Sequence, residues 1–135
     1  MAETRGDIYS KQLPLVFQTS SNYVLLLGGH FPVIDAAGPG RKVYQITIRP
    51  DHEIKAKVDK LLISAGLLDE KGKLSEAAKE PLYLFWLVPP NAFKEWKNKA
   101  PIFPTNPKCS DDEKQCWEKY VVQFALEASE VGPDR

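Results

Sequence analysis

One acidic residue and three polar ones stand in two neighbouring segments that could form a metal-dependent site. The segment FPVIDAAG carries Asp35 at the end of an apolar run, and RKVYQITIRPDHEIK, residues 41–55, carries Gln45, Thr47 and Lys55. Mg²⁺ prefers oxygen ligands, often one or two carboxylates together with waters and phosphate oxygens. The ion activates an attacking water and neutralises charge on the phosphodiester. These residue types therefore indicate a nuclease-like site with Asp35 and Gln45 as metal ligands.

The site requires that the two segments pair as an antiparallel hairpin. HFPVIDA, residues 30–36, is predicted as a strand, AGPGRK as a turn, and KVYQITI, residues 42–48, as the next strand. Pairing Asp35 opposite Gln45 puts both side chains on one face together with Thr47. A slip of one residue in the register would break this arrangement.

Lys55 supplies the positive charge in this interpretation. A helix is predicted to begin near His52 and to end at Gly66. Its apolar positions fall on one stripe at helical spacing: Ile54, Val58, Leu61, Leu62 and Ala65. Lys55 lies in the first turn, from where its ammonium can lean over the strand ends toward a phosphate.

Each candidate residue also has an ordinary structural interpretation. Asp35 can cap the turn that follows it, a position in which Asp is common. Gln45 and Thr47 can be solvated positions on an edge strand, and Lys55 a solvated residue on a helix surface. Spacing alone is weak evidence for a functional site, so both interpretations stay open.

The remaining segments complete a mixed α/β pattern. Residues 23–29 predict a buried strand, and residues 82–90, apolar on both faces, predict a central strand that is covered on both faces. This strand should run parallel to the second hairpin strand, with the helix as the crossover. Residues 91–99 predict a short helix. SDDE at 110–113 has the form of a capping box, which predicts the start of a further short helix. In residues 119–128 apolar and other residues alternate, which predicts a last strand.

Length and composition indicate an ordinary globular protein. The chain has 135 residues, 43% of them hydrophobic, and its 18 basic and 18 acidic residues give a net charge of zero. One domain is expected from this length. A chain without net positive charge has no long-range electrostatic attraction for nucleic acid or an anionic membrane. No apolar run approaches the roughly 20 residues that span a bilayer, and the N-terminus lacks a signal-peptide core, so an intracellular location without a membrane partner is predicted. Cys109 and Cys116 are expected to be free thiols.

The hairpin and helix segments, followed by LYLFWLVPPNAFKEW and KYVVQFALEA, resemble the C-terminal module of Crinkler and RHS (retrotransposon hot spot) type proteins. The resemblance covers roughly residues 14–128. Such proteins are large intracellular effectors that often pair an NTPase module with a domain similar to PD-(D/E)XK restriction endonucleases, and many act in the host nucleus. The resemblance implies one endonuclease-like domain over residues 1–135, with its core at about 14–128, in the host nucleus or cytoplasm. No GxxxxGK[ST] motif is present, so the NTPase half is absent.

The resemblance also implies roles for the candidate residues. Asp35 matches the aspartate of the motif, Gln45 its second acidic position, and Thr47 the place of its lysine. An amide thus replaces a carboxylate and a hydroxyl replaces an ammonium. Lys55 is interpreted as the lysine, moved to the neighbouring helix. Mg²⁺ remains the implied cofactor, bound at a weakened or lost catalytic site.

Two functions are consistent with these observations. The first is a nuclease-like domain that acts on or binds nucleic acid, with the basic and aromatic stretch Lys94, Trp96, Lys97 and Lys99 along the phosphate backbone. Trp96 can instead be a core residue, and the net charge of zero does not favour a DNA-binding protein. The second is a catalytically inactive module that binds a host protein or dimerises, for which segments such as APIFPTNP would suit a docking loop.

Overall fold

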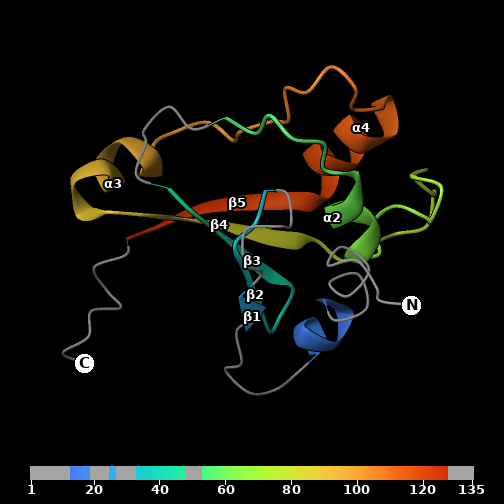
Figure 1. Ribbon diagram of the computed structural model, residues 1–135, viewed down its shortest axis with the longest axis horizontal. Helices are drawn as coiled ribbons and strands as arrows, with labels where there is room; N and C mark the ends of the chain where they lie inside the picture. The colour runs from blue at the N-terminus through green and yellow to red at the C-terminus, as the bar shows by residue number, and fades with distance from the viewer. Residues whose placement is uncertain (1–12, 19–24, 27–32, 48–52, 128–135) are drawn as a thin grey trace, which may run out of the picture.

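The computed structural model describes residues 13–18, 25–26, 33–47 and 53–127, which form a mixed α/β fold (Figure 1). Its five strands follow one another across one sheet in sequence order: β1 (Leu25–Leu26), β2 (Ala36–Gly38), β3 (Lys42–Ile46), β4 (Leu82–Val88) and β5 (Val121–Glu127). β2 is antiparallel to β1 and β3, whereas β3, β4 and β5 are parallel. The predicted interior strand at residues 82–88, parallel to the second hairpin strand, is confirmed.

Three helices pack against one side of this sheet, α2 (Asp59–Ser64), α3 (Pro90–Lys97) and α4 (Asp111–Tyr120) (Figure 1). Residues 13–18 are also helical and contribute Leu13, Val16 and Phe17 to the core. Within the described part of the chain, none of the helices has the length and apolar composition needed to cross a membrane.

The described residues cover only one face of β4. Leu82, Leu84, Trp86 and Val88 are buried, while the residues that alternate with them are only partly buried. The expectation that both faces of this strand are covered is therefore wrong for the described structure. A pattern of apolar residues shows that both faces are hydrophobic, but not that a second layer of helices lies over both.

The hairpin forms with shorter strands than predicted. β2 consists of Ala36–Gly38, which the sequence assigned mainly to the turn, and the turn itself is reduced to residues 39–41. Gly40 and Arg41 both have positive φ, which allows so tight a connection. Residues 33–35, predicted as strand, precede β2 and are irregular, and residues 30–32 lie outside the described part of the chain.

The predicted helix begins later than expected, at Asp59. Its predicted start near His52 lies outside the described residues, and residues 53–58 are irregular. Ile54 forms a bridge with Pro104, and the carbonyl of Ile54 accepts the N–H of Thr105 at 2.9 Å. The Ile54 carbonyl, which would accept a hydrogen bond within a helical turn, is therefore bonded to a segment that is distant in the sequence. The end of the helix at Gly66 is as predicted, with the left-handed φ of 77° that favours glycine.

α4 begins as the sequence predicts. The Glu113 N–H donates to Ser110 Oγ at 3.1 Å, and the Ser110 N–H donates to Glu113 Oε1 at 3.3 Å, which completes a capping box. Cys109 precedes this helix and Cys116 lies within it, and both are buried, free thiols. The helix ends directly at β5, so the last strand is also where the sequence placed it.

Candidate functional site

Asp35 lies at the end of the β2–β3 hairpin, beside Gln45. Ala36 pairs with Tyr44, and continuing this register by one pair sets Asp35 opposite Gln45, as predicted. The regular ladder stops there, because the Asp35 N–H donates to the Tyr44 carbonyl at 2.7 Å. The Asp35 carboxylate instead accepts the Ile46 N–H through Oδ2 at 2.9 Å.

This contact gives Asp35 the capping role that its sequence position also indicated. Among the described residues, the Ile46 N–H is the one hydrogen-bond donor to the carboxylate. A carboxylate has about four lone-pair sites, so acceptor capacity is left for a cation. The capping interpretation and the ligand interpretation are therefore compatible in this geometry.

Gln45 is part of β3, which lies between β2 and β4, and Thr47 directly follows β3, so neither is on an edge strand. The alternative in which both are solvated edge positions is therefore wrong. Thr47 is 6% exposed, and its N–H donates to the Leu87 carbonyl at 3.0 Å, which continues the pairing with β4. Gln45 is half-buried, and its Nε2 donates to the Ile46 carbonyl at 3.2 Å. Its Oε1 is the atom that could face a metal.

Lys55 reaches the same region from an irregular segment, not from a helix. A hollow of about 190 Å³ is lined by Val33, Gln45, Glu53, Ile54, Lys55 and Ala56. The structure thus brings Gln45 and Lys55 to one hollow, whereas Asp35 is not among the residues that line it. The Lys55 side chain is 81% exposed, and its Nζ lies 3.6 Å from Glu53 Oε2.

Glu53 is a candidate that the sequence reasoning missed. It stands two residues before Lys55, and in an extended segment such neighbours project to the same side. The signal was the E-x-K spacing, which was overlooked because a helix was expected there. Within the described ranges, no group of three or more His, Cys, Asp or Glu side chains is placed to hold a metal ion.

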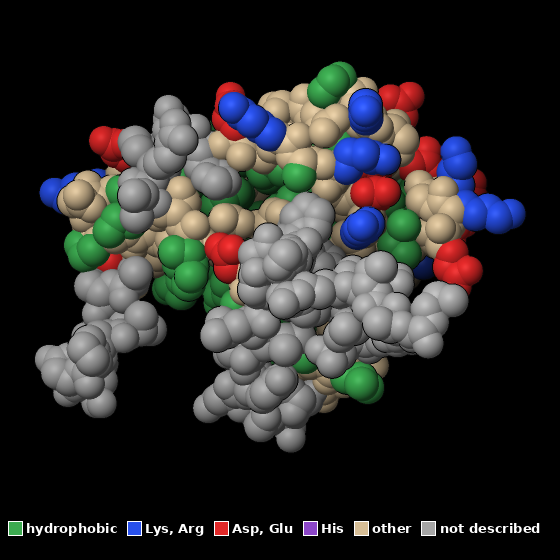
Figure 2. Space-filling model, in the orientation of Figure 1, with side chains coloured by type: hydrophobic (Ala, Val, Ile, Leu, Met, Phe, Trp, Pro, Cys, Tyr) green, Lys and Arg blue, Asp and Glu red, His purple; other side chains and the backbone are tan. Residues whose placement is uncertain are grey.

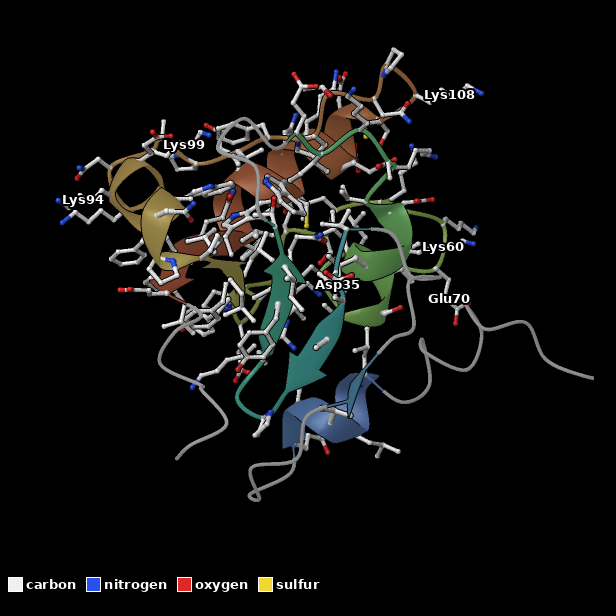
Figure 3. The ribbon with its side chains drawn as sticks, turned by 60° about the vertical axis from the view of Figure 1, so that its left-hand side comes forward. Asp35, Lys60, Glu70, Lys94, Lys99 and Lys108 are labelled. Carbon is white, nitrogen blue, oxygen red and sulfur yellow. The ribbon has the colours of Figure 1, made fainter. Side chains whose placement is uncertain are left out.

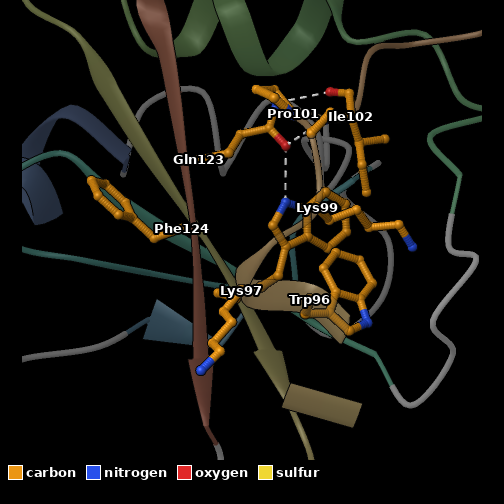
Figure 4. A pocket seen from close by; sticks show the side chains of 10 residues that line it. Trp96, Lys97, Lys99, Pro101, Ile102, Gln123 and Phe124 are labelled. Carbon is orange, nitrogen blue, oxygen red and sulfur yellow. Dashed lines mark hydrogen bonds between the residues drawn. The ribbon is translucent and has the colours of Figure 1, made fainter. Parts of the chain in front are cut away.

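A second hollow, of about 270 Å³, lies on the helix-covered face between α3, the segment after it and β5 (Figure 4). Gln123 organises this hollow. Its Oε1 accepts from Trp86 Nε1 at 3.0 Å and from the Ile102 N–H at 3.1 Å, and its Nε2 donates to the Ile102 carbonyl at 2.8 Å. Lys97 and Lys99 line the same hollow as Gln123.

The basic and aromatic stretch is divided between surface and core. Lys94, Lys97 and Lys99 are exposed, and Figure 3 shows Lys94 and Lys99 at the α3 end of the molecule. Trp96 is 4% exposed, and its ring lies 5.2 Å from that of Trp86. Lys99 Nζ lies 4.6 Å from the centre of the Trp96 ring. Trp96 is therefore a core residue whose ring lies against Lys99, and it does not offer an open ring for stacking a base.

The two hollows are on the same face of the sheet, at β3 and β5, with β4 between these strands. Gln45 pairs with Trp86 on β4, and Trp86 pairs with Ala125 on β5. Neighbouring strands are about 4.8 Å apart, so Gln45 and Ala125 are separated by roughly 10 Å. Gln45 lines the first hollow and Ala125 the second, with Trp86 between them.

The opposite face of the sheet carries an apolar surface that no described helix covers. We call it the open face, and it consists of Tyr44, Ile46, Tyr83, Phe85, Leu87, Val122, Phe124 and Leu126. Its central row is aromatic: the Phe85 ring lies 5.5 Å from that of Tyr44 and 5.1 Å from that of Phe124, both stacked. Ile46 and Phe124 are 57% and 44% exposed. In Figure 2, hydrophobic side chains are visible on the side of the molecule away from α2, α3 and α4.

No family model matches the chain, and no curated protein or solved structure matches it either. The resemblance to Crinkler and RHS type modules therefore stays a prediction from the sequence.

Proposed function

We propose that the chain is an endonuclease-like domain of a Crinkler or RHS type intracellular effector, which binds nucleic acid and has a weakened metal site. The observation that carries this proposal is the position of Asp35 beside Gln45 at the carboxyl end of β3, with Lys55 at the same hollow as Gln45. In sheets with parallel strands, ligands commonly bind at the carboxyl ends.

The metal would be held by Asp35 and the amide oxygen of Gln45, with Glu53, which lines the same hollow as Gln45, as a further carboxylate candidate. When bound, Mg²⁺ lowers the pKa of a water and neutralises charge on the phosphate. One carboxylate and one amide hold this ion more weakly than two carboxylates. Lys55 adds little compensation, because its ammonium is largely solvated and lies near Glu53. We therefore expect nucleic-acid binding with little cleavage.

Lys97 and Lys99 extend the proposed interface along the same face. The phosphates of a duplex or a single strand follow one another at regular short intervals, so cations from neighbouring parts of one protein face can contact a single backbone. Lys55 lines one hollow and Lys97 and Lys99 line the other, so these three lysines are the proposed backbone contacts. The absence of a net positive charge means that binding should depend on this local group.

Fluorescence anisotropy with labelled duplex and single-stranded oligonucleotides tests the binding. The double variant Lys97→Ala/Lys99→Ala should lower the affinity and reduce the slope of log K against log salt by about 1.8 on duplex DNA. The double variant Lys108→Ala/Lys114→Ala is the matched control, because it also removes two positive charges and both lysines are exposed; Lys108 lies near the start of α4, away from the hollow (Figure 3), and Lys114 is in α4. Equal losses for both variants would mean that only total charge matters and would contradict the proposed interface.

Restoring the missing carboxylate tests the metal site. Gln45→Glu should raise Mn²⁺- or Mg²⁺-dependent cleavage above that of the natural chain, and adding Asp35→Ala should remove this gain. Gln45→Leu, similar in size but without a ligand atom, should show no gain. Robust cleavage by the natural chain that survives Asp35→Ala would mean that the site lies elsewhere.

A second candidate function is a catalytically inactive protein-interaction module. The open face favours it, because uncovered apolar surfaces of this kind commonly mark protein-binding sites. Absence of nucleic-acid binding by the natural chain would leave this candidate as the better one.

A further inference from the structure

β5 is an edge strand of the described sheet, and no described strand pairs with the outer side of its residues Val121 to Leu126. It lies last in the sheet and pairs with β4 along its whole length, from Val121 to Glu127. In a strand, alternate residues direct their N–H and C=O groups to the two sides. Over Val121 to Leu126, the outer side of β5 therefore has a row of backbone donors and acceptors that no described strand pairs with.

This edge lacks the features that usually prevent pairing with another chain. Natural edge strands carry lysines, prolines or bulges, or are very short. β5 has no charged residue and no proline from Val121 to Leu126. Val122, Phe124 and Leu126 are 39%, 44% and 39% exposed, so its apolar residues reach the outer edge of the open face.

We propose that β5 pairs antiparallel with β5 of a second copy of this chain, with the two-fold axis at Phe124. This inference does not depend on the nucleic-acid proposal and specifies a partner for the interaction-module candidate. In this register Val122 lies opposite Leu126 of the partner subunit, and Gln123 lies opposite Ala125 of the partner subunit. Every pair on the open face is then apolar, and the polar Gln123 meets a small residue.

Charge also favours a second copy. Glu127 is the one charged residue of β5, and this register sets it opposite Val121 of the partner subunit, so the two Glu127 carboxylates do not meet. Like charges directly opposite each other destabilise strand pairs. The net charge of zero adds no long-range repulsion between copies. A sequence that is complementary to itself in this way needs no other partner to supply the matching strand.

The aromatic row gives the pairing a further contact. Tyr44, Phe85 and Phe124 stack in sequence across β3, β4 and β5 and end at the free edge. Phe124 would meet Phe124 of the partner subunit there, as directly opposite residues have Cα atoms about 4.5–5.5 Å apart. The stack of three rings would become a continuous row across both copies. Aromatic pairs of this kind stabilise adjacent strands.

Sedimentation velocity with charge-introducing variants tests the interface. The natural chain should dimerise in a concentration-dependent way, and Leu126→Lys should weaken the dimer at least tenfold, because each interface gains two lysines. Ile46→Lys is the matched control, as Ile46 is on the open face and more exposed, but lies on β3, away from the edge. It should leave the dimer intact, and circular dichroism should show both variants folded.

Cysteine cross-linking tests the register. Phe124→Cys should form an intermolecular disulfide with oxidised glutathione as the oxidant, because disulfides need Cα atoms about 4.4–6.8 Å apart. In the same register Val122→Cys lies about four residues, roughly 13 Å, from its own copy and should not cross-link. The native thiols do not interfere, because Cys109 and Cys116 are 6% and 0% exposed.

Three results would overturn the proposal. The natural chain could stay monomeric up to the hundred-micromolar range. Ile46→Lys could dissociate the dimer as well as Leu126→Lys does, which would indicate that two open faces pack against each other. Val122→Cys could cross-link as readily as Phe124→Cys, which would indicate a different register or random collision.

Discussion

The stability of two adjacent β4 variants should report directly whether the open face is uncovered in solution. Leu84 is fully buried on the helix-covered face, between Val43 and Gln123. Phe85 is next to it on the open face and is only partly buried between the rings of Tyr44 and Phe124. Truncating each to alanine removes apolar contacts in both cases, but leaves a cavity only at Leu84.

The expected magnitudes follow from this difference. Leu84→Ala should cost about 3–4 kcal/mol, since it combines lost burial with a cavity that its neighbours cannot fill. Phe85→Ala should cost about 2 kcal/mol, from partial burial and two ring contacts, because water replaces the ring and no cavity remains. The larger side chain should thus be the less costly to remove. A fully buried phenylalanine would instead cost about 3–5 kcal/mol.

Urea denaturation followed by tryptophan fluorescence measures both values. With a slope of about 2 kcal/mol per molar urea, the midpoints should fall by about 1 M for Phe85→Ala and about 1.7 M for Leu84→Ala. Low protein concentration is needed, because dimerisation would add concentration-dependent stability. A Phe85→Ala cost equal to or above that of Leu84→Ala would mean that this face is covered in the folded monomer, and the reasoning would be refuted.

Three further predictions concern the helices and the buried thiol. Glu113 is 2% exposed and accepts the buried Val58 N–H at 3.4 Å, so Glu113→Ala should cost about 2–4 kcal/mol by urea denaturation, and Glu113→Gln clearly less. Gly66→Ala should cost about 1 kcal/mol because of its left-handed φ of 77°, and a neutral result would mean that the helix end relaxes. Burial raises the pKa of Cys116 from 9.0 to about 11, so the unfolded chain loses this proton first. The free energy of unfolding should therefore fall as the pH rises from about 9 to 11, and Cys116→Ala should flatten that fall.

The features that sequence predicted well are set by local or strongly periodic patterns. The capping box is complete within the four residues Ser110 to Glu113. β4 and β5 follow from long apolar or alternating runs. The hairpin register was also predicted, because a tight turn leaves few ways to pair two short strands.

The features that sequence predicted poorly depend on distant contacts. Ile54 falls on a helical apolar stripe and is buried, but its backbone pairs with Pro104, some fifty residues away. Asn106 Nδ2 likewise donates to the Lys55 carbonyl at 3.0 Å, which holds the segment in an extended form. No local pattern contains that information. For this reason Lys55 was assigned to a helix, and Glu53 was missed.

The proposed nucleic-acid interface and the proposed dimer interface at β5 are adjacent. The hollow with Lys97 and Lys99 also includes Phe124 and Ala125 of β5. A two-fold axis perpendicular to the sheet keeps the same face of both copies on one side, so two such hollows would flank the strand pair. Their four lysines would lie on one side of the strand pair, and a polyanion lying over both hollows would contact all four. Nucleic acid should then favour the dimer, and by linkage the dimer should bind nucleic acid more tightly than the monomer does.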